Sequence, residues 1–178
     1  MDTFWLAQAI GVAGLAAIVY SYLGTTRGQI LDRQIASSAL FIAHFSLLSA
    51  WTGALTHAVV IVRNWVFARR DTEAWAKHLA WVFLFCVLSI GVALFSWQGP
   101  ISLFPMVSVL IGIYARWQEK ASEIRVYGLI GCLLWLPYTI AVNSYAGTVS
   151  QLVIAAAILY GMFRHDRGAA KTALTIPG

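Results

Sequence analysis

The chain has 178 residues, of which 60% are hydrophobic and 11% are charged, and its mean hydropathy is +0.76. A soluble domain carries about 25% charged residues, so this composition excludes a soluble protein and predicts an all-α, polytopic membrane bundle. The formal net charge of +5 comes from the segments between apolar runs. That distribution indicates a lipid bilayer as the partner, and no nucleic acid.

The apolar runs predict seven transmembrane helices. They comprise residues 5–23, 35–50, 51–68, 79–97, 100–117, 126–142 and 146–163. Several are close to the lower end of the roughly 17–25 residues that cross a bilayer. Two connections, around residues 51–53 and 143–147, are short enough to make the helices on either side antiparallel neighbours.

The basic residues lie on one side of the predicted bundle. Eleven of the twelve Lys and Arg residues lie after the first, third, fifth and seventh runs or, in the case of Arg116, at the very end of the fifth, and the intervening segments hold none. Cytoplasmic loops are enriched in Lys and Arg, so we expect the N-terminus outside and the C-terminus in the cytoplasm. Arg63, inside the third run, is the exception.

The chain also matches itself at a shift of 94 residues, although chance alignment of apolar segments is an alternative. The match predicts a 3+1+3 arrangement of two parallel three-helix repeats, related by an axis along the membrane normal. Residues 1–68 and 100–164 form the predicted repeats, 69–99 a cytoplasmic loop and linker helix, and 165–178 a disordered tail. The paired positions are Tyr20 and Tyr114, Phe41 and Trp135, His44 and Tyr138, Trp51 and Tyr145, and Gly53 and Gly147.

Aromatic and polar residues within the spans are candidates for a binding site. Phe41 and Trp135 would face each other across a pore and sandwich a planar substrate, with His44 and Tyr138 one turn later as hydrogen-bond donors. His57 and Asn64 are seven residues apart, nearly two helical turns, and therefore point the same way. The alternatives are packing or lipid contact for the aromatic rings, and interhelical hydrogen bonds for the polar side chains.

Arg63 is the single residue that most needs an explanation. It lies six residues before Arg69, about 9 Å along a helix, so its side chain can snorkel to the cytoplasmic interface. No predicted span contains Asp or Glu, which excludes an ion pair inside the membrane. The functional alternative is an anion site, because an unpaired guanidinium favours a carboxylate or a phosphate.

Short motifs resemble a known family over nearly the whole chain. They are Trp5-Leu6-Ala7-Gln8 and Gly11-Val12, Arg63 before Arg69-Arg70, Leu103-Phe104-Pro105, Trp135, and Tyr145-Ala146-Gly147. On these residues the chain resembles the bacterial inner-membrane YgjV family. More distantly, the 3+1+3 plan is similar to that of SWEET (MtN3) and PQ-loop proteins. The resemblance implies a multi-pass protein of the bacterial cytoplasmic (inner) membrane, and it supplies no substrate.

The resemblance to SWEET-like transporters implies hinges and a pocket-lining asparagine. Those transporters place one proline in each of four helices around the pore. Pro105 and Pro137 fit two of these places, and Gly11 is a permissive substitute at a third. The fourth is Ala43, and the Pro-Gln pair of PQ-loop proteins is absent. Asn64 matches the pocket-lining asparagine, which has no counterpart near Ile158 in the other repeat.

No nucleophile–base pair, metal-ligand spacing or nucleotide fingerprint occurs in the sequence, so we expect no enzyme, no cofactor and no metal. The leading hypothesis is a SWEET-like small-molecule transporter or facilitator of the inner membrane, with a sugar or a small organic anion as substrate. The alternative is a membrane protein that binds or scaffolds without transport. A homo-oligomer stays open.

Overall fold

The computed structural model describes residues 2–21, 27–117 and 121–163. Within these residues the chain forms seven α-helices and two short 3-10 helices, with no strand, so the predicted all-α class is confirmed. This follows from the apolar composition, because a segment that crosses a bilayer must bond its backbone groups internally. The predicted disordered tail, residues 165–178, lies outside the described residues.

The helices follow the predicted apolar runs closely. The third run is reproduced in full, whereas α2 and α6 begin eight and five residues before their runs. Hydropathy marks the apolar part of a helix, and these two helices continue through polar residues at one end. The elements are α1 Thr3–Ser21, α2 Arg27–Leu47, α3 Trp51–Ala68, η1 Ala74–Lys77, α4 Ala80–Phe95, η2 Pro100–Ser102, α5 Leu103–Trp117, α6 Ala121–Ala141 and α7 Tyr145–Gly161.

Length and hydropathy together mark two helical segments as long enough to cross a membrane, Thr3–Ser21 and Pro100–Trp117. Three further apolar helices in the described part of the chain are shorter, Ala80–Phe95, Arg125–Ala141 and Tyr145–Tyr160. On α4, large apolar side chains such as Phe83 and Phe95 are 65% and 88% exposed. A continuous apolar surface of this kind is typical of contact with lipid.

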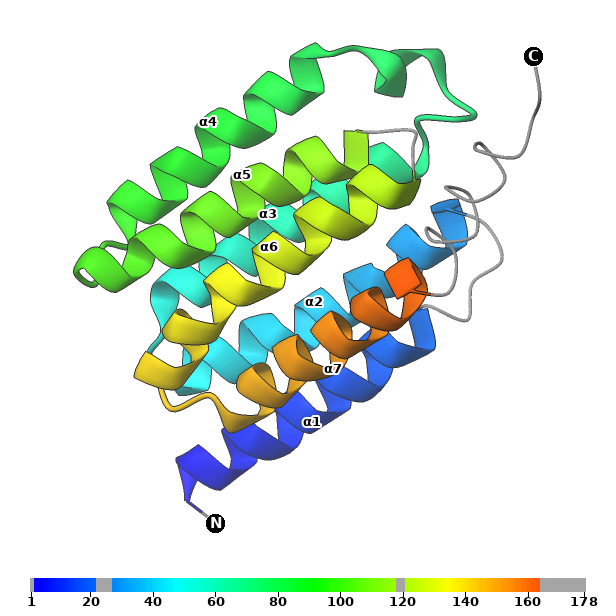
Figure 1. The fold of residues 1–178 in the computed structure, drawn as a ribbon. Helices are drawn as coiled ribbons and strands as arrows, with labels where there is room; N and C mark the ends of the chain where they lie inside the picture. Colours follow the sequence, from blue (N-terminus) through cyan, green and yellow to red (C-terminus); the bar gives the residue numbers. More distant parts are fainter. Residues whose placement is uncertain (1, 22–26, 118–120, 164–178) are drawn as a thin grey trace.

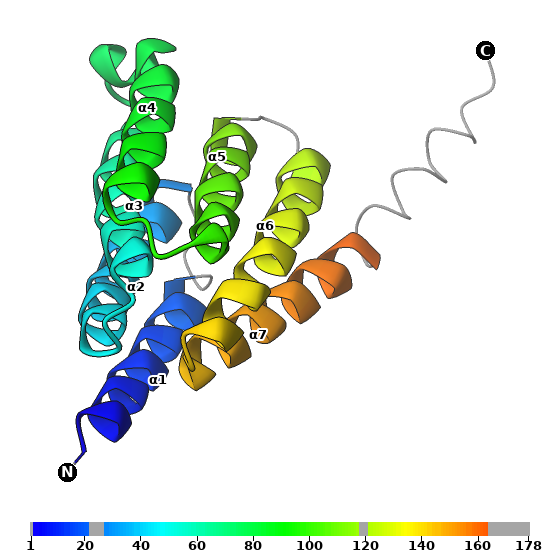
Figure 2. The same ribbon diagram turned by 90° about the vertical axis from the view of Figure 1, so that its left-hand side faces the viewer.

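The helices form two groups that pack against each other (Figure 1). In the first half, α1 to α3, the central α2 packs on both neighbours. In the second half, α5 to α7, α6 does the same, and α4 packs on α3 and α5. Two helix pairs, α1 with α7 and α3 with α5, join the halves. Figure 2 shows α1 and α7 close together near the N-terminus of α1 and diverging toward their other ends.

Small residues and serines bring the helices of each half together. Ser37 Oγ donates to Gly14 O at 2.8 Å between α2 and α1. Ser108 Oγ donates to Gly131 O at 2.9 Å between α5 and α6. The two pairs occupy positions 94 residues apart with donor and acceptor exchanged. Close approach through small residues is the usual basis of helix packing in membranes.

The turns after α2 and after α6 have the same backbone geometry. Ser49 and Asn143, 94 residues apart, both adopt positive φ angles, of 55° and 53°. The next residues donate equivalent hydrogen bonds, Ala50 N to Phe45 O at 2.9 Å and Ser144 N to Thr139 O at 2.8 Å. Both turns lie slightly earlier than predicted, since α3 and α7 already begin at Trp51 and Tyr145. We call the end of the bundle that holds these turns the turn end.

Hydrogen bonds cross between the halves at the turn end. From the first half, His44 Nε2 lies 2.6 Å from Ser144 Oγ in the turn after α6. From the second half, Tyr138 Oη accepts from Gly53 N at 2.7 Å and donates to Ala50 O at 3.3 Å. Each half thus satisfies polar groups in the turn of the other, and we call these the crossed hydrogen bonds.

Gln8 adds a second tie at the same end. Its Nε2 donates to Asn143 O at 2.9 Å, and its Oε1 accepts from Ala146 N at 3.1 Å. A single side chain of α1 therefore bonds the backbone on both sides of Ser144. Because the groups are shielded from water, both halves depend on this geometry for their hydrogen bonding.

Replacing Tyr138 by Phe tests the crossed hydrogen bonds. The variant leaves the buried Gly53 N without its acceptor, and the free energy of unfolding should fall by about 1–3 kcal/mol. Thermal unfolding of the purified protein in detergent measures the change. Tyr145→Phe is the matched control, because Tyr145 is 57% exposed. Equal stability of the two variants would show that the bond to Gly53 contributes nothing.

Candidate functional site

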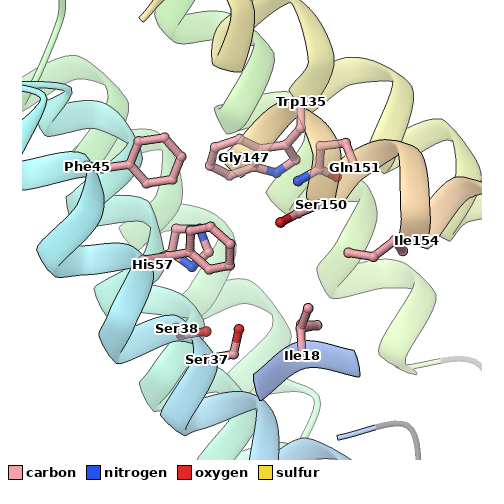
Figure 3. Close-up of a pocket in the computed structure, with 11 residues that line it drawn as sticks. Ile18, Ser37, Ser38, Phe45, His57, Trp135, Gly147, Ser150, Gln151 and Ile154 are labelled. Carbon is pink, nitrogen blue, oxygen red and sulfur yellow. The ribbon is translucent and has the colours of Figure 1, made fainter. Parts of the chain in front are cut away.

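A cavity of about 60 Å³ lies between the two halves. Figure 3 shows Ser150, Gln151 and Ile154 of α7 on one side, facing His57, Ser37 and Ser38 on the other. The cavity is therefore shared by both halves and belongs to neither alone. Its lining residues are Ile18, Ser37, Ser38, Phe41, Phe45 and His57 from the first half, and Trp135, Gly147, Ser150, Gln151 and Ile154 from the second.

His57 stands at the centre of the aromatic part of this cavity. Its ring is stacked on Phe41 and Phe45, with centroids 5.2 and 5.7 Å away, and tilted against Trp135 at 5.5 Å. Its Nδ1 is buried and has no hydrogen-bond partner. A buried polar atom without a partner is costly, so His57 is the residue of the cavity lining whose hydrogen bonding is incomplete.

The aromatic residues predicted to sandwich a substrate enclose His57 in this structure. Phe41 and Trp135 both line the cavity, as the 94-residue match led us to expect. The imidazole of His57 contacts both rings and occupies the place between them. A planar ligand in that position would require the halves to move apart or His57 to rotate.

The cavity is small in this conformation. At about 60 Å³ it exceeds several-fold the roughly 10–15 Å³ that one water needs. It is well below the roughly 300 Å³ at which small-molecule sites begin. This volume is enough for a few waters, and a larger solute would fit only if the halves or the lining side chains moved.

His44 and Tyr138 lie outside the cavity, although they were predicted to donate hydrogen bonds to a substrate. Both side chains are fully buried and take part in the crossed hydrogen bonds. His44 Nδ1 lies 2.7 Å from Ala7 O, and a carbonyl only accepts, so Nδ1 carries the proton. In the neutral ring, Nε2 then accepts from the Ser144 hydroxyl. All polar atoms of these two side chains are thus used within the protein.

Arg63 and Asn64 form a second polar group, nearer the other end of α3. Arg63 is 2% exposed, and its Nη2 and Nε donate to Asn64 Oδ1 at 2.9 and 3.3 Å. Asn64 Nδ2 in turn donates to Gln34 Oε1 on α2 at 3.4 Å. The guanidinium therefore points into the protein and does not reach the interface. Asn64 shares the helix face of His57 but lies outside the cavity lining.

The three predicted hinges occupy different environments. A Cβ at Gly11 would lie 2.6 Å from Ala146 Cβ and 2.7 Å from His44 Nδ1, so Gly11 permits the close contact of α1 with α7 and α2. Pro105 is buried in the first turn of α5, where a helix tolerates proline. Pro137 lies inside α6 and removes one backbone hydrogen bond. Of the three, Pro137 alone removes a hydrogen bond from the interior of a helix, and it directly precedes Tyr138.

Eight of the eleven lining residues were not predicted, Gln151 and Phe45 among them. Gln151 follows His57 by 94 residues, so the repeat match contained the signal for it. Phe45 had no such signal, because its partner at that shift is Thr139, which does not line the cavity. Among the described residues, no group of three or more His, Cys, Asp or Glu side chains is arranged to hold a metal ion.

The sequence matches one known family over most of its length. The family model Imp-YgjV, described as bacterial inner membrane protein, matches residues 5–169. Inner membrane protein YgjV of Escherichia coli (strain K12) is 22% identical over 151 residues, which cover 85% of this chain and 79% of that protein. No solved structure matches the chain. An all-helical bundle with apolar outer surfaces agrees with the sequence match, and the chain belongs to the YgjV family of bacterial inner membrane proteins.

Proposed function

We propose that the protein is a transporter or facilitator for a small molecule, not an enzyme, and that its substrate binds in the cavity between the two halves. The observation that carries this proposal is the shared lining of the cavity. Phe41 and His57 come from one half and Trp135 and Gln151 from the other, with the unpartnered Nδ1 of His57 among them. A site divided between two bodies changes its shape whenever they move relative to each other.

Correspondences at the 94-residue shift support two parallel three-helix repeats with α4 as the linker. The turns at Ser49 and Asn143 share one geometry, and the crossed hydrogen bonds run in both directions. The packing of α1 on α7 corresponds to that of α5 on α3. Such contacts are expected of two similar units related by an axis along the membrane normal. The likeness to SWEET and PQ-loop proteins stays a prediction.

The asymmetry between the two ends of the bundle supports a conformational cycle. Among the described residues of α7, the buried ones all lie before Gln151, namely Ala146, Gly147 and Ser150, and α7 then diverges from α1 (Figure 2). The crossed hydrogen bonds close the turn end, which is the outer side in the predicted orientation. In that orientation this conformation is closed to the outside and looser toward the cytoplasm.

Opening the turn end requires the crossed hydrogen bonds to break. Pro137 precedes Tyr138 in α6 and removes the backbone hydrogen bond that residue 137 would otherwise make with Leu133. The last turn of α6 therefore bends more easily than an uninterrupted helix. This places a flexible point beside one of the two side chains that hold the halves together.

The proposed orientation is tested by labelling single cysteines with a membrane-impermeant thiol reagent in spheroplasts. The background carries Cys86→Ser and Cys132→Ser. Gln98→Cys, at the turn end, should react in intact spheroplasts, whereas Asp71→Cys should react only after lysis, because positively charged loops stay in the cytoplasm. The reverse pattern would place the turn end inside and contradict the orientation.

The transport proposal is tested by uptake into liposomes that contain the purified protein. Radiolabelled neutral sugars and small organic acids are the substrates, with protein-free liposomes as the reference. We expect faster uptake of at least one compound, and a loss of tenfold or more in His57→Phe. Phenylalanine keeps the ring stacking but lacks Nδ1, so stability should be unchanged or slightly higher.

His78→Phe is the matched control, because it makes the same change at an exposed position in the loop before α4. It should transport like the unmodified protein. Uptake that is unaffected by His57→Phe would remove the cavity from the proposal. Binding of a compound without any uptake would favour the non-transporting alternative.

A further inference from the structure

Arg63 is a buried cation whose hydrogen bonds are incomplete. Its side chain is 2% exposed, and the two bonds that it makes in the described part of the chain both end on Asn64 Oδ1. A guanidinium carries five N–H donors, and the Nη1 group donates to no described residue. Burying a charge without an opposite charge or full hydrogen bonding is strongly unfavourable. The groups around Nη1 therefore determine whether a ligand can complete the hydrogen bonding of Arg63.

A second guanidinium approaches the same place from α5. A Cβ built at Gly112 would stand 3.6 Å from Arg63 Nη1 and 3.1 Å from Arg116 Nη1. Apart from neighbouring residues and the backbone of its own helix, no other heavy atom lies within 4 Å of that point. Arg116 Nη1 also donates to Gly112 O at 3.2 Å. Glycine at 112 thus leaves the position next to both nitrogens without a side chain.

Asn64 and Gln34 hold Arg63 in this orientation. The amide nitrogen of Asn64 donates to Gln34 Oε1 at 3.4 Å, which turns Asn64 Oδ1 toward the guanidinium. Nε and Nη2 are both engaged by that oxygen. The Nη1 side of the fork is then directed toward α5, so the arrangement is set by three helices, α2, α3 and α5.

The corresponding positions of the other helix pair carry no such group. At the 94-residue shift, Ala157 and Ile158 stand for Arg63 and Asn64, and Ile18 stands for Gly112. Ala157 is exposed, and α7 diverges from α1 toward this end of the bundle (Figure 2), so these positions form no equivalent polar group. Of the two corresponding helix pairs, only α3–α5 therefore holds a buried arginine at this place.

We propose that Arg63, with Arg116 and the space at Gly112, binds an oxyanion, the carboxylate or phosphate group of a small solute or of a lipid headgroup. Two positive groups that converge on one point repel each other, and an anion between them reverses that interaction. A planar guanidinium also matches the geometry of carboxylate and phosphate oxygens. The proposal concerns binding and requires no transport, so it stands or falls independently of the cavity between the halves.

Isothermal titration and thermal unfolding of the full-length protein in a neutral detergent test the proposal. The probes are inorganic phosphate, acetate and succinate at constant ionic strength, with glucose as the neutral reference. We expect at least one anion to bind and to raise the melting temperature, since a ligand of the folded state stabilises it. Arg63→Gln should weaken that binding at least tenfold, and Arg63→Lys less, because lysine keeps the charge but loses the fork.

Arg69→Gln is the matched control. It removes one positive charge from the end of the same helix, where Arg69 lies 3.9 Å from Asp32. Binding in this variant should stay within twofold of the unmodified protein. Equal weakening in Arg63→Gln and Arg69→Gln would reduce the effect to general charge and overturn the proposal.

Gly112→Ala keeps the test decisive if Arg63→Gln does not fold. The alanine keeps both guanidinium groups and favours the helix, but its Cβ occupies the position between them. We expect weaker anion binding, by fivefold or more, with an unchanged or higher melting temperature in the absence of anion. Unchanged binding in Gly112→Ala would place any bound anion elsewhere and overturn the proposal.

A lipid arm separates the two sources of the anion. The protein is placed in nanodiscs of phosphatidylcholine, with and without phosphatidylglycerol, and its melting temperature is measured for the same variants. A stabilisation by phosphatidylglycerol that is lost in Arg63→Gln identifies a headgroup site, whereas stabilisation by soluble anions alone identifies a solute site. No Arg63-dependent effect of either source would overturn the proposal.

Discussion

Polar groups inside this bundle must find their partners within the protein, because lipid offers none. The two turns at Ser49 and Asn143 bring backbone groups to the end of the bundle where the halves meet. Each half supplies the side chain that the other lacks, His44 for Ser144 and Tyr138 for Gly53. Neither half satisfies its turn alone, so the pairing of the halves and the position of the cavity between them both follow from these bonds.

Two polar groups of α3 are exceptions among the described residues: His57 Nδ1 is buried without a hydrogen-bond partner, and the buried Arg63 bonds only to Asn64 Oδ1. Both lie on α3, and both cost stability where they are. The residues around them make regular contacts: aromatic rings pack against His57, and the side-chain amides of Asn64 and Gln34 bond to each other beside Arg63. Departures of this kind from otherwise consistent packing are expected at functional sites, which is why we place the two sites there.

The sequence was sufficient for the helices but not for the depth of each side chain in the bundle. Hydropathy located α3 in full, and the 94-residue match located the cavity residues Phe41 and Trp135. His44 was assigned to the same site because it lies one turn from Phe41. Its side chain instead bonds to Ser144 of the other half and lies outside the cavity lining. Asn64 shares a face with His57 but lies about 10 Å farther along the helix. Helical periodicity predicts the face of the helix on which a side chain lies. The residues that this side chain contacts depend on how helices distant in the sequence pack together.

The correspondences at the 94-residue shift make the exceptions to them informative. Positions that build the frame correspond across the 94-residue shift, as the glycine–serine pairs of α1–α2 and α5–α6 do. Positions that carry unusual chemistry do not, since Arg63 faces α5 where Ala157 is its counterpart. The buried guanidinium on the α3–α5 side is the clearest departure from this correspondence, and the proposed oxyanion would supply the opposite charge that the described residues do not.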